Sequence, residues 1–185
     1  MDRVSTGAKG LDEILGGGFP KGRTILVVGS PGSGKTIFTV QFLRAGTENG
    51  DRSLYVALDE KPEQVKENVS AFGWDLDRLE AEGKLMFIDA TPFRRTKSLS
   101  FGKYEVQGVL PLQEAIPEIS LEGLIQVVKR VAEEESVSRI AVDPITSLVV
   151  RYPDPAKRRR AILMLFDALS STGATCLVTT ELRTS

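Results

Sequence analysis

Apolar residues in this chain fall into short β-branched runs that alternate with longer stretches of helical spacing. The run from Thr24 to Val28 ends in a glycine-rich turn, and apolar residues then recur at helical intervals up to a stop region at Gly46 and Gly50. This order predicts a strand, a loop and a helix. Further strands are predicted at 53–58, 85–89, 139–142 and 175–180, and further helices at 62–72, 121–135 and 157–171.

Strands that alternate with helices favour a parallel sheet whose two faces are both covered. The predicted fold class is therefore α/β, with three layers and a mostly parallel central sheet between helices. With 185 residues, of which 41% are hydrophobic, the chain is predicted to form a single domain. The stretch 91–117 has three prolines, two glycines and no clear period, which predicts a long loop of functional importance or high mobility.

The composition narrows the possible chemistry. The chain has no histidine and a single cysteine, Cys176, which excludes internal disulfides, zinc clusters and histidine-based triads. Twenty-four Lys plus Arg against 25 Asp plus Glu give a net charge of −1, which predicts no overall attraction to nucleic acid or anionic lipid. Without a membrane-spanning apolar run or a signal peptide, the protein is expected to be soluble and cytoplasmic.

The residues after the first predicted strand match a phosphate-binding pattern of glycine, four free positions, glycine, lysine, and serine or threonine. They are Gly29, Ser30, Pro31, Gly32, Ser33, Gly34, Lys35 and Thr36. A loop around a triphosphate must point backbone N–H groups inward, and glycines permit the dihedral angles that this requires. The next helix adds its positive dipole end, Lys35 a flexible charge and Thr36 a hydroxyl ligand for Mg2+. The pattern therefore predicts binding of ATP, or a closely related nucleotide, with Mg2+.

Three acidic residues at strand ends are candidates for the rest of the site. Asp143 follows a predicted strand and is predicted to order the Mg2+ shell, because ligands gather at the carboxyl ends of parallel strands; a turn before Pro144 is the alternative. Asp59 and Glu60 end the second strand, where a carboxylate can orient and deprotonate an attacking water. Acids there also suit the start of the next helix, so position alone leaves both interpretations open.

Further motifs lie on both sides of the glycine-rich loop. They are Ser5-Thr6-Gly7, Gly10-Leu11-Asp12 and the run 15–22 before it, and Phe72-Gly73-Trp74-Asp75 and Gly83-Lys84-Leu85 after it. With these motifs, nearly the whole chain resembles the RecA-like P-loop ATPases, and among them the KaiC-like family of archaeal and bacterial relatives of the circadian clock protein KaiC. The segment 72–75 is more particular to KaiC-like members than to recombinases.

The resemblance implies roles for several residues. In this family a pair of adjacent glutamates after the second strand activates the attacking water, and the matching pair is Asp59-Glu60. Because aspartate replaces one glutamate, Glu60 is the expected base, with Asp59 beside it. Thr180 is suggested as a sensor near the γ-phosphate. Such proteins commonly form hexameric rings with nucleotide between subunits, which implies a homo-oligomer completed by basic residues of a neighbour, none of which can be assigned here.

The chain departs from the family in its length. Family domains usually continue past the fifth strand, so this chain is expected to lack the usual C-terminal strands and to leave a sheet edge unpaired. Weak activity, or dependence on a protein partner, would follow. The autophosphorylated hydroxyls of KaiC itself lie in that later region, so the resemblance does not support an autokinase.

The resulting hypothesis is a Mg-dependent ATPase that acts as a nucleotide-switched regulatory or signalling protein. A second hypothesis is a recombinase-like protein that grips single-stranded DNA, because Arg94, Arg95, Lys97 and Lys103 interleave with aromatic residues in the long loop. The near-neutral charge and the segment 72–75 argue against it. A third is an interaction module that binds ATP with little turnover.

Overall fold

The computed structural model describes residues 2–91 and 120–182. The elements in chain order are β1 (Arg3–Val4), α1 (Lys9–Ile14), β2 (Phe19–Pro20), β3 (Thr24–Gly29), α2 (Lys35–Glu48), β4 (Ser53–Ala57), α3 (Pro62–Ser70), α4 (Leu76–Ala81), β5 (Leu85–Asp89), α5 (Leu121–Glu134), β6 (Arg139–Asp143), α6 (Thr146–Arg151), α7 (Pro155–Ser171) and β7 (Thr175–Glu181). Apart from Thr91, the predicted loop 91–117 lies outside the described residues, and so do its basic and aromatic side chains.

The larger sheet has the strand order β3-β7-β6-β4-β5, and all of its neighbouring strands run parallel. The inner strands β4 and β6 are buried along their whole length, as expected for strands covered on both faces. A separate antiparallel pair, β1 with β2, was not predicted. The α/β fold with a parallel central sheet is confirmed.

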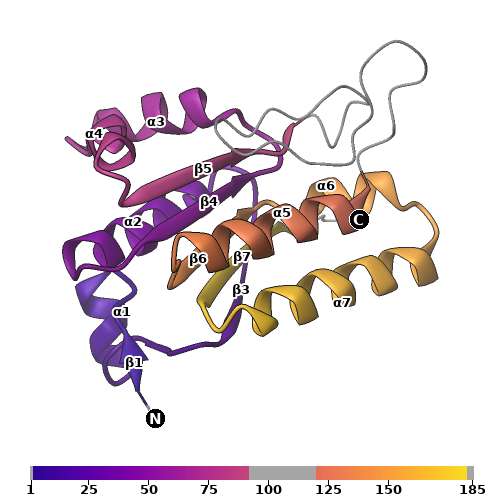
Figure 1. Ribbon diagram of the computed structural model, residues 1–185, viewed down its shortest axis with the longest axis horizontal. Helices are drawn as coiled ribbons and strands as arrows, with labels where there is room; N and C mark the ends of the chain where they lie inside the picture. The colour runs from indigo at the N-terminus through magenta and orange to yellow at the C-terminus, as the bar shows by residue number, and fades with distance from the viewer. Residues whose placement is uncertain (1, 92–119, 183–185) are drawn as a thin grey trace.

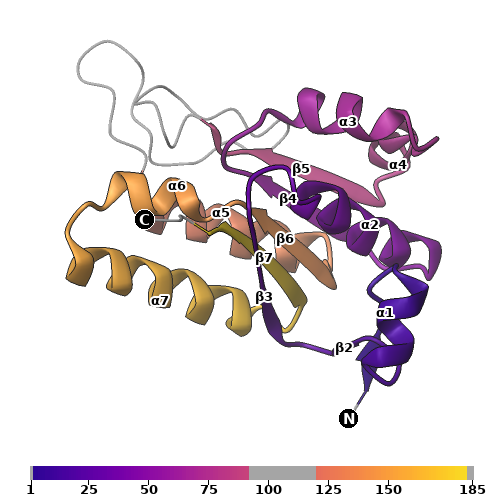
Figure 2. The same ribbon diagram turned by 180° about the vertical axis from the view of Figure 1, so that it is seen from behind.

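Strand alternation divides the apolar core into two layers, one on each face of the sheet. In β4, Leu54 and Val56 belong to the layer that contains the apolar residues of α5 and α7. Tyr55 and Ala57 belong to the layer formed with α2, α3 and α4. Figure 1 shows α5 and α7 in front of the sheet, and Figure 2 shows α2 and α3 on the opposite side.

Capping residues and apolar stripes explain where the long helices α5 and α7 begin and how α5 packs on the sheet. Ser120 caps α5 by accepting a hydrogen bond from the Gly123 N–H at 3.0 Å, and the buried stripe of α5 then faces the sheet. The helix α7 begins two residues before its predicted start, because Asp154 accepts from the Lys157 N–H at 2.8 Å and Pro155 suits a first turn. In the part of the chain that the structure describes, no helix combines the length and apolar character needed to cross a bilayer.

A compact hydrogen-bonded turn holds the N-terminal segment. The Asp12 carboxylate accepts from the Ser5 hydroxyl at 2.6 Å, the Thr6 N–H at 2.7 Å and the Thr6 hydroxyl at 2.6 Å. Partial burial acts to raise the pKa of Asp12, but these hydrogen bonds hold it below its ordinary value. Hydrogen bonds thus join the motif at 5–7 to the motif at 10–12, which lies within α1.

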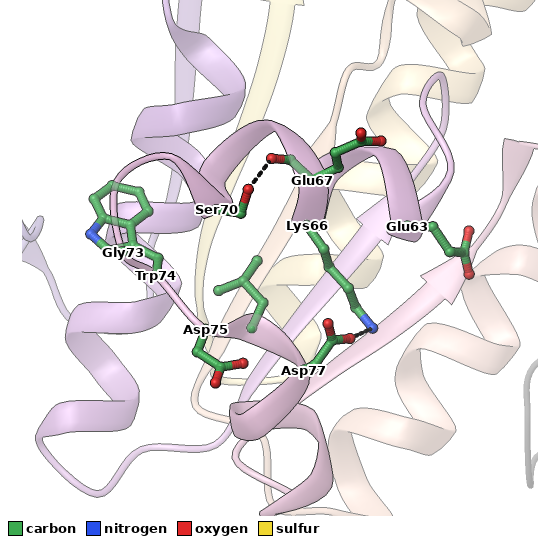
Figure 3. A pocket seen from close by; sticks show the side chains of 9 residues that line it. Glu63, Lys66, Glu67, Ser70, Gly73, Trp74, Asp75 and Asp77 are labelled. Atoms are coloured by element: carbon green, nitrogen blue, oxygen red, sulfur yellow. Dashed lines mark hydrogen bonds and ion pairs between the residues drawn. The ribbon is translucent and has the colours of Figure 1, made fainter.

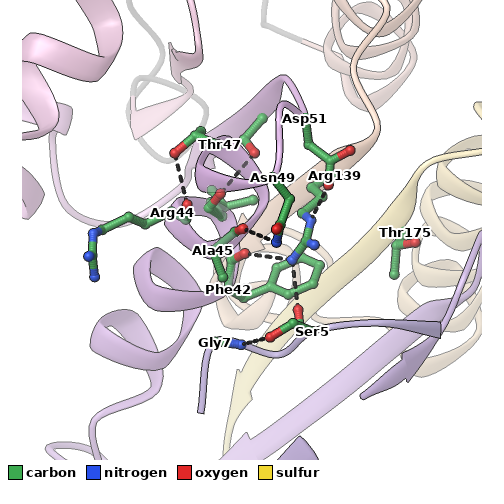
Figure 4. Close-up of polar contacts among 12 residues, drawn as sticks. Ser5, Gly7, Phe42, Arg44, Ala45, Thr47, Asn49, Asp51, Arg139 and Thr175 are labelled. Carbon is green, nitrogen blue, oxygen red and sulfur yellow. Dashed lines mark hydrogen bonds and ion pairs between the residues drawn. The ribbon is translucent and has the colours of Figure 1, made fainter. Parts of the chain in front are cut away.

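The buried Arg139 connects this turn to the sheet (Figure 4). Its guanidinium donates to the carbonyl oxygens of Ser5 at 2.7 Å and Phe42 at 3.0 Å, and to Oδ2 of Asp51 at 2.8 Å. A Cβ at Gly46 would lie 2.4 Å from Cδ of Arg139, so this position of α2 has no room for a side chain. Arg139 therefore joins the N-terminal segment, α2 and the start of β6, the strand that ends at Asp143.

Candidate functional site

The predicted phosphate loop lies between the end of β3 and the start of α2 (Figure 2). A Cβ at Gly29 would lie 2.5 Å from the Ser33 hydroxyl oxygen, so a side chain there would force Ser33 to move. Gly32 and Gly34 have φ angles of 74° and 84°, in the left-handed region that side chains disfavour. The backbone angles therefore favour glycine at 32 and 34, and the close approach of Ser33 favours it at 29.

The N-terminus of α2 fits an anion. Its N-cap is Gly34, and no side chain caps the first turn. By contrast, side chains cap α5 and α7, the other helices of at least 14 residues among those described. First-turn N–H groups need partners from outside the helix, and together with the helix dipole they suit a phosphate.

Lys35 brings a positive charge into the same loop. Its Nζ donates to the carbonyl oxygens of Gly29 at 3.1 Å and Ser30 at 2.8 Å. These two carbonyls hold the ammonium group against the loop backbone, where it can balance the charge of a bound phosphate. The sequence motif and the three-dimensional loop thus describe the same set of groups.

Thr36 and Asp143 meet beside the loop. The Thr36 hydroxyl donates to Oδ2 of Asp143 at 2.8 Å, and Asp143 is only 5% exposed. A hydroxyl and a carboxylate are the hard oxygen ligands that Mg2+ prefers. The described residues contain no cluster of three or more carboxylate, histidine or cysteine ligands. A donor set this small fits Mg2+, which commonly takes one or two protein ligands and completes its shell with phosphate and water.

Two further hydroxyls reach Asp143: that of Tyr55, which was not predicted as a site residue, and that of Thr179, which lies in the polar strand end 179–181 expected near the γ-phosphate but was given no role of its own. Tyr55 Oη donates to Oδ2 of Asp143 at 2.6 Å, and the Thr179 hydroxyl donates to Oδ1. Burial raises the pKa of Tyr55 well above its ordinary value, helped by the negative charges of Asp143 and Glu60, so the phenol stays protonated and remains a donor. The Asp143 carboxylate thus accepts hydrogen bonds from three side-chain hydroxyls.

Strand alternation explains why Thr179 contacts Asp143 and Thr180, the residue suggested as a γ-phosphate sensor, does not. Leu177 packs in the core layer on the α2 side of the sheet, whereas Cys176 and Val178 pack in the opposite layer. By the same two-residue period, Thr179 faces the α2 side and Thr180 the other side. The polar residues at the end of β7 indicated that this strand end belongs to the site. Which of them points toward the loop can be decided only once the side of the sheet that α2 covers is known.

Asp59 and Glu60 lie directly beyond β4, where its end adjoins Asp143. The Leu58 N–H donates to the Asp143 backbone carbonyl at 2.9 Å, so the structure brings the acidic pair beside the metal candidates. Both acids are exposed, and Oε2 of Glu60 accepts from Asn68 Nδ2 on α3 at 3.0 Å. The N-cap of α3 is Lys61, so neither acid occupies the capping position that the alternative interpretation would give it.

A groove of about 500 Å3 between α3 and α4 is separate from these residues. Figure 3 shows its lining, which includes Lys66 and Trp74 but none of the predicted site residues. Lys66 Nζ forms ion pairs with Asp77 at 2.7 Å and Glu80 at 2.5 Å, so its charge is already balanced. The remaining charged lining is acidic, which does not suit a phosphate. The candidate nucleotide site is therefore the loop at the end of β3.

Comparison with known proteins finds relatives along nearly the whole chain. A family model described as the KaiC ATPase matches residues 4–185. A UPF0273 protein of Pyrococcus furiosus is 37% identical over 180 residues, which cover 97% of this chain and 68% of the relative. The circadian clock oscillator protein KaiC of Synechococcus elongatus is 33% identical over 180 residues, which cover 97% of this chain and 32% of that protein.

A solved structure shows the same likeness in three dimensions. The crystal structure of a KaiC-like protein from the hyperthermophilic archaeon Pyrococcus horikoshii matches with a TM-score of 0.78 and 29% sequence identity. The match covers 98% of this chain and 71% of that one.

Proposed function

This chain belongs to the KaiC family of ATPases, and on that premise we propose that it binds ATP with Mg2+ at the loop 29–36 and hydrolyses it slowly. The nucleotide state would switch an assembly of this chain, alone or with a protein partner, in a regulatory or signalling role. The names of several relatives give only an uncharacterised family, so this role rests on the likeness to the circadian clock protein KaiC.

The observation that carries the proposal is the contact between Thr36 and Asp143. It joins the start of α2 to the end of β6, and it places a hydroxyl and a carboxylate together beside the loop. A glycine-rich turn alone can be a flexible connection without a ligand. A turn with a positive helix end, a lysine and paired oxygen ligands fits a nucleoside triphosphate with its divalent ion.

The groups at this site would have distinct tasks. The first-turn amides of α2 and the Lys35 ammonium hold the phosphates and balance their charge. Thr36 and Asp143 would hold Mg2+, which supplies charge neutralisation of the phosphates when bound. Catalysis would then consist largely of positioning and electrostatic stabilisation by groups that the fold has already arranged.

The water-activating role is proposed for Glu60, with Asp59 beside it. Glu60 lies next to the strand end that carries Asp143 and has a carboxylate oxygen held by Asn68. Its exposed side chain can accept a proton from a water directed at the γ-phosphate. With no histidine in the chain, a carboxylate is the natural base.

A second copy of the chain would complete the site. Ser30, Pro31, Gly32 and Ser33 are exposed, as are both candidate acids, so water has free access to this part of the molecule. Phosphoryl transfer benefits from exclusion of bulk water, and covering this face with a neighbouring subunit would provide it. We therefore propose a homo-oligomer, with a ring of six as the form suggested by the family resemblance.

The test measures binding, turnover and assembly on the same protein. Equilibrium titration with ATP, ADP and GTP, each with Mg2+ and with EDTA, should show Mg-dependent binding that Lys35→Ala weakens. ATP turnover per subunit should rise with protein concentration, and the particle mass should increase with Mg-ATP. Absence of nucleotide binding by the parent protein would refute the proposal. Binding without turnover would favour the interaction module, and turnover stimulated by single-stranded DNA would favour the recombinase-like alternative.

A further inference from the structure

The Asp143 carboxylate is held by hydroxyls on three different elements. Thr36 from α2 and Tyr55 from β4 both donate to Oδ2, at 2.8 Å and 2.6 Å, and Thr179 from β7 donates to Oδ1. Thr36 has a place in the proposed function as a metal ligand. The proposed function gives no role to Tyr55 or Thr179. Their side chains are 1% and 0% exposed, so they lie below the surface that a nucleotide would contact.

The sheet geometry directs these two side chains at Asp143. In the pairing of β4 with β6, Ala57 is opposite Asp143 and Tyr55 is opposite Ala141. Tyr55 is therefore on the same face as Asp143, two residues back along the adjacent strand, and its long side chain spans the offset. Thr179 reaches the carboxylate from β7, the strand on the other side of β6.

Packing alone does not require either hydroxyl. The Tyr55 ring packs in the apolar layer with its centroid 5.6 Å from that of Phe87, and a phenylalanine would fill the same space. At Thr179 a valine would retain the branched shape that suits a buried strand. A buried polar group costs free energy unless it is hydrogen-bonded, so these two hydroxyls are explained by the carboxylate that they contact.

The terminal torsion of an aspartate is broad, so a carboxylate with one partner can rotate. Donors on both oxygens, from opposite neighbouring strands, remove that freedom. Resting on the proposed Mg-ATP site, we propose that Tyr55 and Thr179 are positioning residues that fix the Asp143 carboxylate beside Thr36 and thereby set the affinity of the site for Mg2+. Groups that orient a metal ligand in this way typically change metal affinity by about 10- to 100-fold when they are removed.

The experiment measures the Mg2+ concentration that gives half of the Mg-dependent gain in affinity for a fluorescent ATP analogue. Tyr55→Phe and Thr179→Val should each raise this concentration about tenfold or more, while the affinity measured in EDTA stays at the parent value. Thr179→Ser, which restores the hydroxyl, should return it close to the parent value. Tyr152→Phe is the matched control, because Tyr152 packs against the opposite core layer.

The outcomes separate this inference from the proposed function. If the parent protein binds nucleotide without any effect of Mg2+, the metal site and this inference both fail. If the parent responds to Mg2+ but Tyr55→Phe and Thr179→Val respond at the same concentration, the positioning role alone is wrong. A lower melting temperature with an unchanged Mg2+ requirement would also overturn that role, since it would reduce both hydroxyls to a structural function. Thr179→Val allows the test even where Tyr55→Phe folds poorly.

Discussion

The Thr36 hydroxyl donates to Oδ2 of Asp143 although the two residues are 107 positions apart in the chain. One begins α2 and the other ends β6, and the parallel sheet brings both to its carboxyl edge. The contact places a hydroxyl and a carboxylate oxygen within hydrogen-bonding distance, and both are oxygen ligands of the kind that Mg2+ prefers.

Replacing Asp143 with asparagine should separate stability from metal binding. The change replaces one accepting oxygen by an NH2 group, so the three hydroxyls that donate to Asp143 lose part of their acceptor and the melting temperature of the nucleotide-free protein should fall. The additional stabilisation that Mg2+ gives to the ATP-bound protein should be lost. Thermal unfolding with ATP in EDTA and with ATP in Mg2+ measures both effects. An undiminished effect of Mg2+ in Asp143→Asn would exclude this carboxylate from the metal site.

Replacing Lys35 with alanine should weaken ATP binding. Charge-assisted hydrogen bonds contribute about 1.5–3 kcal/mol, which corresponds to an increase in Kd of about 10- to 100-fold. Isothermal titration in Mg2+ measures the change. Lys129→Ala, at an exposed position on α5, is the matched control and should bind like the parent. Equal affinities for the two variants would contradict the assignment of Lys35.

Replacing Glu60 with glutamine should spare nucleotide binding and reduce turnover by on the order of a hundredfold or more, because an amide cannot accept the proton. Asp59→Asn should have the smaller effect, since its shorter side chain is the less suitable base. Glu63→Gln is the control for an exposed acid nearby on α3. Steady-state phosphate release with saturating Mg-ATP measures the turnover of the three variants and of the parent protein. Hydrolysis by Glu60→Gln at the parent rate would show that another group activates water.

Two arginines should differ widely in their contribution to stability. Arg139→Ala leaves Asp51 and two carbonyl groups without their buried partner and should lower the free energy of unfolding by about 3–5 kcal/mol. Arg52→Ala removes an exposed pair with Glu135 and should cost less than about 1 kcal/mol. Urea unfolding followed by circular dichroism measures both. Similar midpoints for the two variants would mean that Arg139 does not hold the N-terminal segment in place.

The single cysteine provides a pH-dependent probe of the core. Burial raises the pKa of Cys176 to about 12 from an ordinary value of 9.0, so the native thiol should react with iodoacetamide far more slowly at pH 8 than the urea-unfolded thiol. Because folding raises this pKa, the protonated thiol contributes fully to the free energy of unfolding below pH 9. That contribution is lost as the pH rises from 9 toward 12. Mass spectrometry over time reports one modification site. Rapid labelling of the folded protein at pH 8 would contradict its burial.

Several elements were not predictable from local patterns. The helices α1, α4 and α6 have six residues each, too few to establish a helical period, and β1 and β2 have two residues each. The predicted helix 62–72 ends at Ser70, two residues early, because propensity defines helix ends poorly. Arg139 was predicted only as the start of a strand, although its partners come from positions 5, 42 and 51.

Local sequence was sufficient to predict the strand, glycine loop and helix at 24–48 and the strand–helix alternation of a parallel sheet, and it located the candidate phosphate-binding pattern at 29–36. These features depend on neighbouring residues, on backbone angles that only glycine adopts freely, and on hydrophobic period. Only the folded chain shows that Tyr55 and Thr179 meet Asp143 and that Thr180 faces the other way. Such contacts depend on strand order, register and the face that each helix covers, and no short stretch of sequence encodes them.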